Sequence, residues 1–284
     1  MMRIRILIPY FGRWPHWMPF FVASCRANPD IDWLLFSDCG ELPGAPDNLE
    51  VRAISFADYC QQAGAKLEIA FAPESPYKLC DLKPALGFIH ADELEGYDFW
   101  GFSDIDLVYG QLRRYFTDQR LARYELLSTH ERRVSGHFCL LRNNARMREA
   151  FRSVEGWRRL LANPRHQAFD EVAFSRLFIR RKNWPAGLRR LLDAANPWRR
   201  RSEFAEAYST PNGRIAWVDG SFDFPQRWFW DNGVMRTDRG DEREFPYFHF
   251  IAWKTGWHAA LPEQGADWAL GSRWSISATG FHKD

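Results

Sequence analysis

Residues 97–106 read YDFWGFSDID, an aromatic and apolar run that ends in two carboxylates, Asp104 and Asp106. The bulky apolar residues of 97–102 predict a buried β-strand, so the two carboxylates would emerge at its carboxyl end. Apolar residues follow at 107–109, which places the pair in a hydrophobic stretch where unpaired charge is costly. A divalent cation would remove that cost, because Mg²⁺ and Mn²⁺ prefer hard oxygen ligands. We therefore expect a metal site at this strand end.

Strand and helix patterns alternate around this segment and predict an α/β fold. The expected strands cover residues 4–8, 31–36, 49–54, 124–127 and 137–141, and the expected helices cover 15–27, 79–94 and 167–179. Beyond residue 180 the pattern becomes irregular, apart from a short helix over 188–195 and a hairpin around 211–213. Open α/β sheets bind ligands at the carboxyl ends of their strands, which is where the two aspartates are expected.

Length and composition fit a single globular domain. The chain has 284 residues, of which 46% are hydrophobic and 26% charged. Its five cysteines are scattered without a CxxC pair, which indicates neither a disulfide framework nor a thiolate zinc site. No apolar run reaches the roughly 20 residues of a membrane-spanning helix, and the amino terminus is typical of a strand, so we expect a cytoplasmic location. P-loop and dinucleotide-binding glycine motifs do not occur.

Four motifs follow one another along the chain. They are IPYFG at residues 8–12, KxxDxKPxxG at 78–87, DIDxxxG at 104–110 and SGHF at 135–138. In this order they resemble a bacterial group among the nucleotide-sugar glycosyltransferases of the GT-A fold. The resemblance extends over most of the chain and implies one GT-A-like (Rossmann-like) domain with a mixed, mostly parallel sheet flanked by helices. Residues 1–142 would bind the nucleotide sugar, and residues 143–284 would form the acceptor side and a C-terminal elaboration.

The resemblance also implies where the donor lies. In this fold the ends of the first two strands hold the nucleoside, which points to Pro9, Tyr10, Phe11 and Asp38. Gly136 and His137 of the SGHF motif would contact the donor sugar, the glycine because it lets the backbone come close.

Lys78, Asp81 and Lys83 of the second motif permit two interpretations. They would either line the donor site, with Lys83 near a phosphate or the two aspartates, or form a charged helix cap in which Asp81 accepts backbone amides. The residues alone leave both open.

Asp170 and Glu171 stand at the start of an expected helix, where acids are favourable whatever their function. They resemble the acidic pair that GT-A enzymes direct toward the acceptor, so Asp170 is expected to act as the general base of an inverting transfer. Without that role a retaining mechanism would fit. His249 resembles the late histidine that adds a metal ligand to Asp104 and Asp106, which favours Mn²⁺ over Mg²⁺. Lys254, as a phosphate clamp, and His258 are nearby alternatives.

The implied reaction transfers a hexose from a nucleoside-diphosphate sugar to a saccharide or lipid-linked saccharide, in cell-surface polysaccharide synthesis. A metal-dependent nucleotidyltransferase, a phosphohydrolase and a non-enzymatic anion-binding module remain alternatives, because paired aspartates also serve phosphoryl transfer.

Residues 142–201 carry 16 basic residues against five acidic ones, interleaved with tryptophan and leucine. This excess predicts peripheral contact with the anionic inner face of a membrane, rather than nucleic acid. A solvated helical face is the alternative interpretation.

Overall fold

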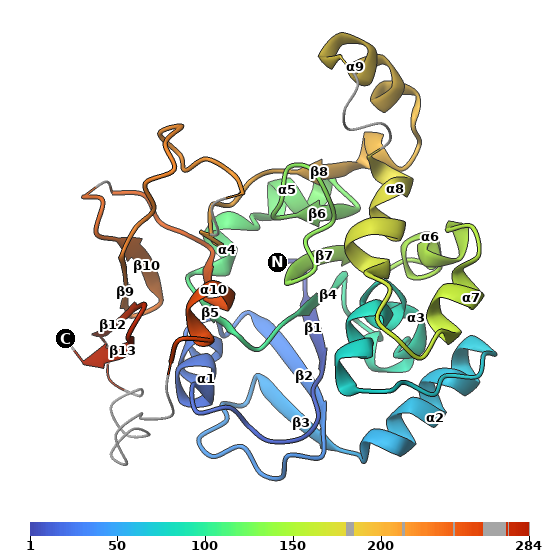
Figure 1. Ribbon diagram of the computed structural model, residues 1–284, viewed down its shortest axis with the longest axis horizontal. Coiled ribbons are helices and arrows are strands. Elements are labelled where there is room, and N and C mark those ends of the chain that lie inside the picture. The colour runs from blue at the N-terminus through green and yellow to red at the C-terminus, as the bar shows by residue number, and fades with distance from the viewer. Residues whose placement is uncertain (180–184, 212–213, 241, 258–270, 272, 284) are drawn as a thin grey trace.

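The computed structural model describes residues 1–179, 185–211, 214–240, 242–257, 271 and 273–283. A seven-stranded sheet with helices on both faces forms its centre (Figure 1). In spatial order its strands are β3 (Leu49–Ala53), β2 (Ile31–Ser37), β1 (Ile4–Pro9), β4 (Phe99–Ser103), β7 (Phe138–Arg142), β6 (Leu126–Ser128) and β8 (Ser202–Phe204). The first four run parallel, β7 is antiparallel to β4 and β6, and β8 is parallel to β6. The predicted mixed, mostly parallel sheet is confirmed.

Both faces of the central sheet are buried, because its strands carry apolar side chains in both directions. On one face, Ile6, Trp33 and Phe99 belong to a cluster with helix α1 and strand β5. On the other, Leu7 and Trp100 belong to a cluster with several short helices. The elements on the two faces include α1 (Met18–Arg26), β5 (Leu107–Tyr109), α2 (Phe56–Leu67), η1 (Pro76–Ala85), α3 (Leu86–Ile89) and α7 (Trp157–Ala162).

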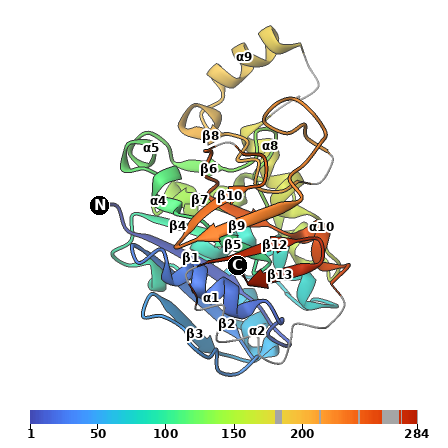
Figure 2. The same ribbon diagram turned by 90° about the vertical axis from the view of Figure 1, so that its left-hand side faces the viewer.

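A second, four-stranded antiparallel sheet packs against α1 (Figures 1 and 2). Its order is β10 (Val234–Thr237), β9 (Arg227–Asp231), β12 (Arg273–Ser277) and β13 (Gly280–Lys283). The Phe20 ring of α1 stacks on Phe281 with ring centroids 3.8 Å apart and meets Trp274 edge to face. Nearby, β11 (Tyr247–His249) pairs antiparallel with β5 in a separate two-stranded sheet, which brings the late part of the chain to the cluster on one face of the central sheet.

The other described elements are short. They are η2 (Asp92–Leu94), α4 (Leu112–Tyr115), α5 (Asp118–Arg123), α6 (Ala145–Arg148), η3 (Ala150–Ser153), η4 (Phe169–Phe174), α8 (Ser175–Phe178), α9 (Ala186–Ala195), η5 (Arg199–Arg201) and α10 (Ile251–Lys254). The proposed division at residue 142 coincides with the end of β7, although β8 from the later part completes the central sheet. The division itself stays a prediction.

Two of the predicted helices differ from the structure in type. The segment 79–94 forms the 3₁₀ helix η1, α3 and η2 instead of one α-helix. Pro84 lacks the amide hydrogen that a continuous helix needs. Gly87 packs directly on the Trp100 ring, because a Cβ at this position would lie 2.3 Å from that ring. The segment 167–179 forms the π-helix η4 followed by α8.

The hairpin predicted around residues 211–213 is only partly covered by the described residues. Asn212 and Gly213 lie outside the described residues, and the described residues beside them form no strand. An Asn-Gly hairpin instead joins β9 to β10, with φ of 48° at Asn232 and 87° at Gly233. Positive φ at both turn residues is the requirement of a type I′ hairpin, which Asn-Gly meets best.

Some arginines of the basic segment 142–201 pair with acids from elsewhere in the chain. Arg146 pairs with Glu125 at 2.9 Å, and Arg165 pairs with Glu74 at 3.3 Å. Residues 180–184, with three of the basic side chains and Trp184, lie outside the described residues. The predicted short helix is present as α9, which projects from the body of the molecule (Figures 1 and 2). Among the helices that the structure describes, none has the length and apolarity needed to span a membrane.

Candidate active site

Asp104 and Asp106 lie in a turn at the carboxyl end of β4, as predicted, and the main chain of two other segments holds this turn. The Asp104 amide donates to the His137 carbonyl oxygen at 3.0 Å, and the Phe250 amide donates to the Asp106 carbonyl oxygen at 3.2 Å. The SGHF motif and the end of β11 therefore meet at the two aspartates, although they are distant in sequence.

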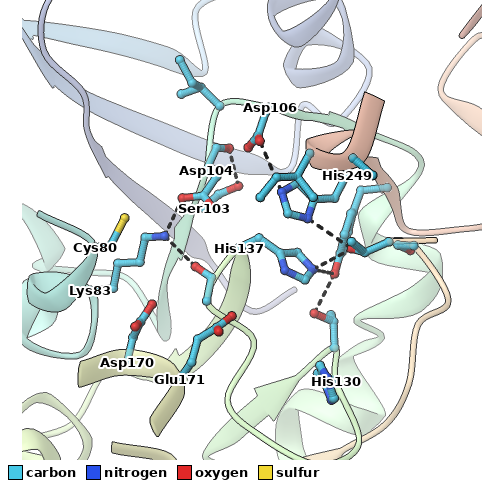
Figure 3. A pocket seen from close by; sticks show the side chains of 18 of the residues that line it. Cys80, Lys83, Ser103, Asp104, Asp106, His130, His137, Asp170, Glu171 and His249 are labelled. Atoms are coloured by element: carbon cyan, nitrogen blue, oxygen red, sulfur yellow. Dashed lines mark hydrogen bonds and ion pairs between the residues drawn. The ribbon is translucent and has the colours of Figure 1, made fainter. Parts of the chain in front are cut away.

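A lysine contacts each of the two carboxylates. Lys83 Nζ lies 2.5 Å from Asp104 Oδ1 (Figure 3) and donates to the Gly136 carbonyl oxygen at 2.7 Å. Lys254 Nζ lies 2.6 Å from Asp106 Oδ2. Burial opposes the charge on Lys83, but Asp104 outweighs it and holds the lysine pKa above its ordinary value. Burial likewise opposes ionisation of Asp106, but His249 and Lys254 outweigh it and hold that pKa below its usual range. Lys83 and Asp106 therefore stay charged near neutral pH.

His249 completes a set of candidate metal ligands. Ligand atoms of Asp104, Asp106 and His249 all lie within 4.8 Å of one another. The β5–β11 pairing places His249 opposite Leu107, which directly follows Asp106.

The burial and contacts of the His249 ring fit a metal ligand. The side chain is buried, and its Nε2 lies 3.4 Å from Asp106 Oδ2 without forming a hydrogen bond to any described residue. A buried nitrogen without a partner calls for an explanation, and an ion is one of them. Two carboxylates and an imidazole form a ligand set that suits Mn²⁺.

Asp170 and Glu171 lie against the SGHF motif, on the other side of Lys83 from Asp104 (Figure 3). A Cβ at Gly136 would be 2.8 Å from both Asp170 Oδ2 and Glu171 Oε1, so only glycine allows this approach. Burial, followed by the charges of Glu171 and Asp104, raises the pKa of Asp170 to about 7 against the pull of Lys83. Asp170 therefore exchanges a proton near neutral pH.

The structure corrects the placement of Lys78 and Asp81, which do not line the cavity. They form a buried ion pair at 2.7 Å, and Asp81 also accepts the amides of Gln167 and Phe169 at 2.7 and 2.8 Å. These amides flank Ala168, whose φ of 48° is uncommon for a residue with a side chain. Asp81 therefore accepts backbone amides at a helix start, as the capping interpretation expected, but the helix is the π-helix η4, which carries Asp170.

Only some of the residues expected to hold the nucleoside line the cavity. Pro9, Tyr10 and Phe11 line the cavity, but Phe11 is 6% exposed and packs mainly on Tyr59. Asp38 is exposed and does not line the cavity, because its carboxylate accepts the Gly12 amide at 2.8 Å. Asp38 thus ties the ends of β1 and β2 together. Of the two further candidates, Lys254 lines the cavity and His258 lies outside the described residues.

A cavity of about 800 Å³ joins these groups, a volume in the range of small-molecule sites. Residues that sequence reasoning missed also line it, including Tyr77, Cys80, His130, Arg133, Glu206 and Thr210. None of them is a fixed position of a motif, and only the folded chain brings them to the aspartates.

Comparison with solved structures finds low-identity likenesses to glycosyltransferases. Mouse xyloside xylosyltransferase 1 in its apo form is 10% identical with a TM-score of 0.42, covering 87% of this chain and 97% of that one. The galactosyltransferase LgtC with donor and acceptor sugar analogues is 10% identical with a TM-score of 0.35, covering 57% and 66%. GlyE of Streptococcus pneumoniae TIGR4 is 8% identical with a TM-score of 0.35, covering 73% and 46%. Scores this low carry no functional assignment.

No curated protein matches the sequence. Residues 6–282 match the family described as a family of unknown function, DUF6625, which is nearly the full length of the chain. The chain therefore belongs to this family.

Proposed function

We propose that this chain is a metal-dependent glycosyltransferase that moves a hexose from a nucleoside-diphosphate sugar to a saccharide or lipid-linked saccharide. The observation that carries the proposal is the cluster of Asp104, Asp106 and His249 in the wall of a ligand-sized cavity, where the buried His249 Nε2 has no hydrogen-bond partner among the residues that the structure describes. The order of the four sequence motifs, which resembles GT-A enzymes, supports the same conclusion.

The donor half of the reaction depends on charge. A divalent cation held by Asp104, Asp106 and His249 would neutralise the negative charge that develops on the leaving diphosphate. Lys83 and Lys254 contact the two carboxylates, so their ammonium groups lie close enough to the proposed metal site to bind the donor phosphates as well. Pro9 and Tyr10, at the end of β1, would contact the nucleoside.

The acceptor half depends on Asp170. A group that titrates near neutral pH suits a general base, because it accepts a proton readily and is still ionised often enough to act. Asp170 would remove the proton of the acceptor hydroxyl while that oxygen bonds to the anomeric carbon and the bond to the diphosphate breaks. Direct attack of this kind inverts the anomeric centre.

A thermal-shift panel of nucleoside-diphosphate sugars, with and without Mn²⁺, tests the proposal. A donor at 100 times its Kd should stabilise the folded state by about 2.7 kcal/mol, and only when Mn²⁺ is present. Products decide between the alternatives. Pyrophosphate release from a nucleoside triphosphate would indicate a nucleotidyltransferase, and release of inorganic phosphate would indicate a phosphohydrolase. Salt-sensitive nucleic-acid binding without any nucleotide-sugar binding would favour an anion-binding module.

A further inference from the structure

Behind the candidate metal ligands, two histidines share one hydroxyl group. The rings of His137 and His249 stack with centroids 4.3 Å apart. Thr210 Oγ1 lies 3.2 Å from His249 Nδ1 and 3.3 Å from His137 Nε2. The His249 amide donates to the Ser209 carbonyl oxygen at 2.8 Å, so the main chain next to Thr210 is fixed to β11.

The Phe138 carbonyl oxygen can only accept a hydrogen bond, and this fixes the donor and acceptor roles of Thr129, Tyr247 and His137. Thr129 Oγ1 donates to the Phe138 carbonyl oxygen at 3.0 Å, so its one hydrogen is used. Tyr247 Oη must then donate to Thr129, at 2.7 Å, and accept from His137 Nε2, at 2.9 Å. His137 therefore carries its hydrogen on Nε2 and donates it to Tyr247, so this nitrogen cannot accept a hydrogen from Thr210.

We propose that Thr210 is a positioning residue that accepts the Nδ1 hydrogen of His249 and thereby leaves the Nε2 lone pair facing Asp106. A hydroxyl oxygen has two lone pairs, so Thr210 Oγ1 can accept the Nδ1 hydrogen of His249. Thr210 lines the cavity, which leaves its own hydrogen free to meet solvent or a bound ligand.

His249 Nε2 lies 3.4 Å from Asp106 Oδ2 and forms no hydrogen bond among the described residues, so this nitrogen is available to an ion that Asp106 would share. Metal-ligating histidines commonly donate their second ring N–H to a fixed acceptor, which sets ring orientation and tautomer. The inference rests on the proposed metal site and adds the group that prepares His249 for it.

Mn²⁺ titration by calorimetry, without nucleotide, tests the effect on affinity. Thr210→Val keeps the shape of the side chain but removes the acceptor, so it should weaken Mn²⁺ binding about 10- to 100-fold. Thr210→Ser keeps the hydroxyl and should bind within a few-fold of wild type. Ser209→Ala is the matched control, because the Ser209 hydroxyl bonds to the Ala207 carbonyl oxygen at 3.3 Å. Wild-type affinity in Thr210→Val would overturn the proposal.

The tautomer itself gives a readout that depends on neither metal nor sugar transfer. Long-range ¹H–¹⁵N spectra of the metal-free protein should show the His249 hydrogen on Nδ1 in wild type and Thr210→Ser, and a changed tautomer mixture in Thr210→Val. A wild-type hydrogen on Nε2 would contradict the proposal. If both readouts agree with it while no nucleotide sugar binds, the glycosyltransferase assignment fails and the role of Thr210 stands. If wild type binds no Mn²⁺, the spectra alone decide.

Discussion

At the scale of single residues, burial separates two neighbouring acids that look equivalent in sequence. Asp170 is 3% exposed, whereas the side chain of Glu171 is 31% exposed and pairs with Arg133 at 2.9 Å. Burial is the main cause that raises the pKa of Asp170 to about 7. The sequence predicted both acids at a helix start, but the difference between them depends on how closely they pack on Gly136, which no local pattern encodes.

Replacing Asp170 by Asn should lower the transfer rate by a factor on the order of 10² or more, because the general base is lost. Donor binding should stay within a few-fold of wild type, as measured by calorimetry. Glu171→Gln is the matched control and should cost much less. Near-normal turnover in Asp170→Asn would remove the base assignment and support a retaining mechanism.

Asp170 should also make folding stability depend on pH. Its folded-state pKa of about 7 lies above the ordinary value of 3.8, so between these values the folded state keeps a proton that the unfolded chain has lost. This contribution to stability is complete below about pH 4 and is lost as pH rises through about 7. Urea unfolding of the metal-free protein should therefore show Asp170→Asn gaining stability relative to wild type over this range, by a few kcal/mol. A constant difference would contradict the buried, protonated state.

At the scale of elements, the site depends on helices that are not ordinary α-helices. The 3₁₀ helix η1 presents Lys83 to Asp104 and places Asp81 against the turn at Ala168, and the π-helix η4 then presents Asp170. Periodicity in the sequence predicted helices in both places. It could not distinguish their types, because Gly87 against Trp100 and Asp81 at the π-helix are tertiary contacts. The same limit explains why the sequence could not decide between the donor-site and capping interpretations of Lys78 and Asp81.

The buried Lys78–Asp81 pair should be important for stability. Asp81→Asn leaves the Lys78 ammonium, at 1% exposure, without a counter-charge, and should destabilise the fold by about 3–5 kcal/mol in urea unfolding. The exposed pair Lys66–Asp92 provides a control with the same charge change, and Asp92→Asn should cost about 1 kcal/mol or less. An equal loss in the free energy of unfolding for the two substitutions would contradict a stabilising role of the buried Lys78–Asp81 pair.

Helix α9 should dock on an anionic bilayer. Leu188, Leu191 and Leu192 follow helical spacing and are 45%, 70% and 37% exposed, and the sequence around them is basic. We expect co-sedimentation with vesicles that contain anionic lipid at low salt, and its loss in a Leu188→Ser, Leu191→Ser double variant. Phe222→Ser removes an exposed apolar side chain elsewhere and should bind like wild type. Equally poor retention by anionic and neutral vesicles would contradict this docking.

At the scale of the whole molecule, the parallel half of the fold could be predicted from sequence and the aromatic C-terminal half could not. Strands β1 and β2 are short, mostly apolar runs and β3 alternates apolar and charged residues, and local patterns of this kind can be detected in the sequence. The second sheet is built from strands that are distant in sequence from α1, although it packs on Phe20 of that helix, and β11 pairs with β5 from about half the chain length away. His249 was therefore expected only from a family resemblance, and Thr210 was not expected at all. The β9–β10 hairpin is an exception, because Asn232-Gly233 is a local hairpin signal in the sequence.

Calorimetric titration with the nucleoside diphosphate of the donor that the panel selects, with and without Mn²⁺, tests the central claim most directly. Wild type should bind it in a Mn²⁺-dependent manner, and Asp106→Asn should remain folded but lose at least about tenfold in that affinity, since one hard ligand is removed. Asp92→Asn should bind like wild type. Unchanged Mn²⁺-dependent affinity in a folded Asp106→Asn protein would show that the turn holding Asp104 and Asp106 is structural and would contradict the account.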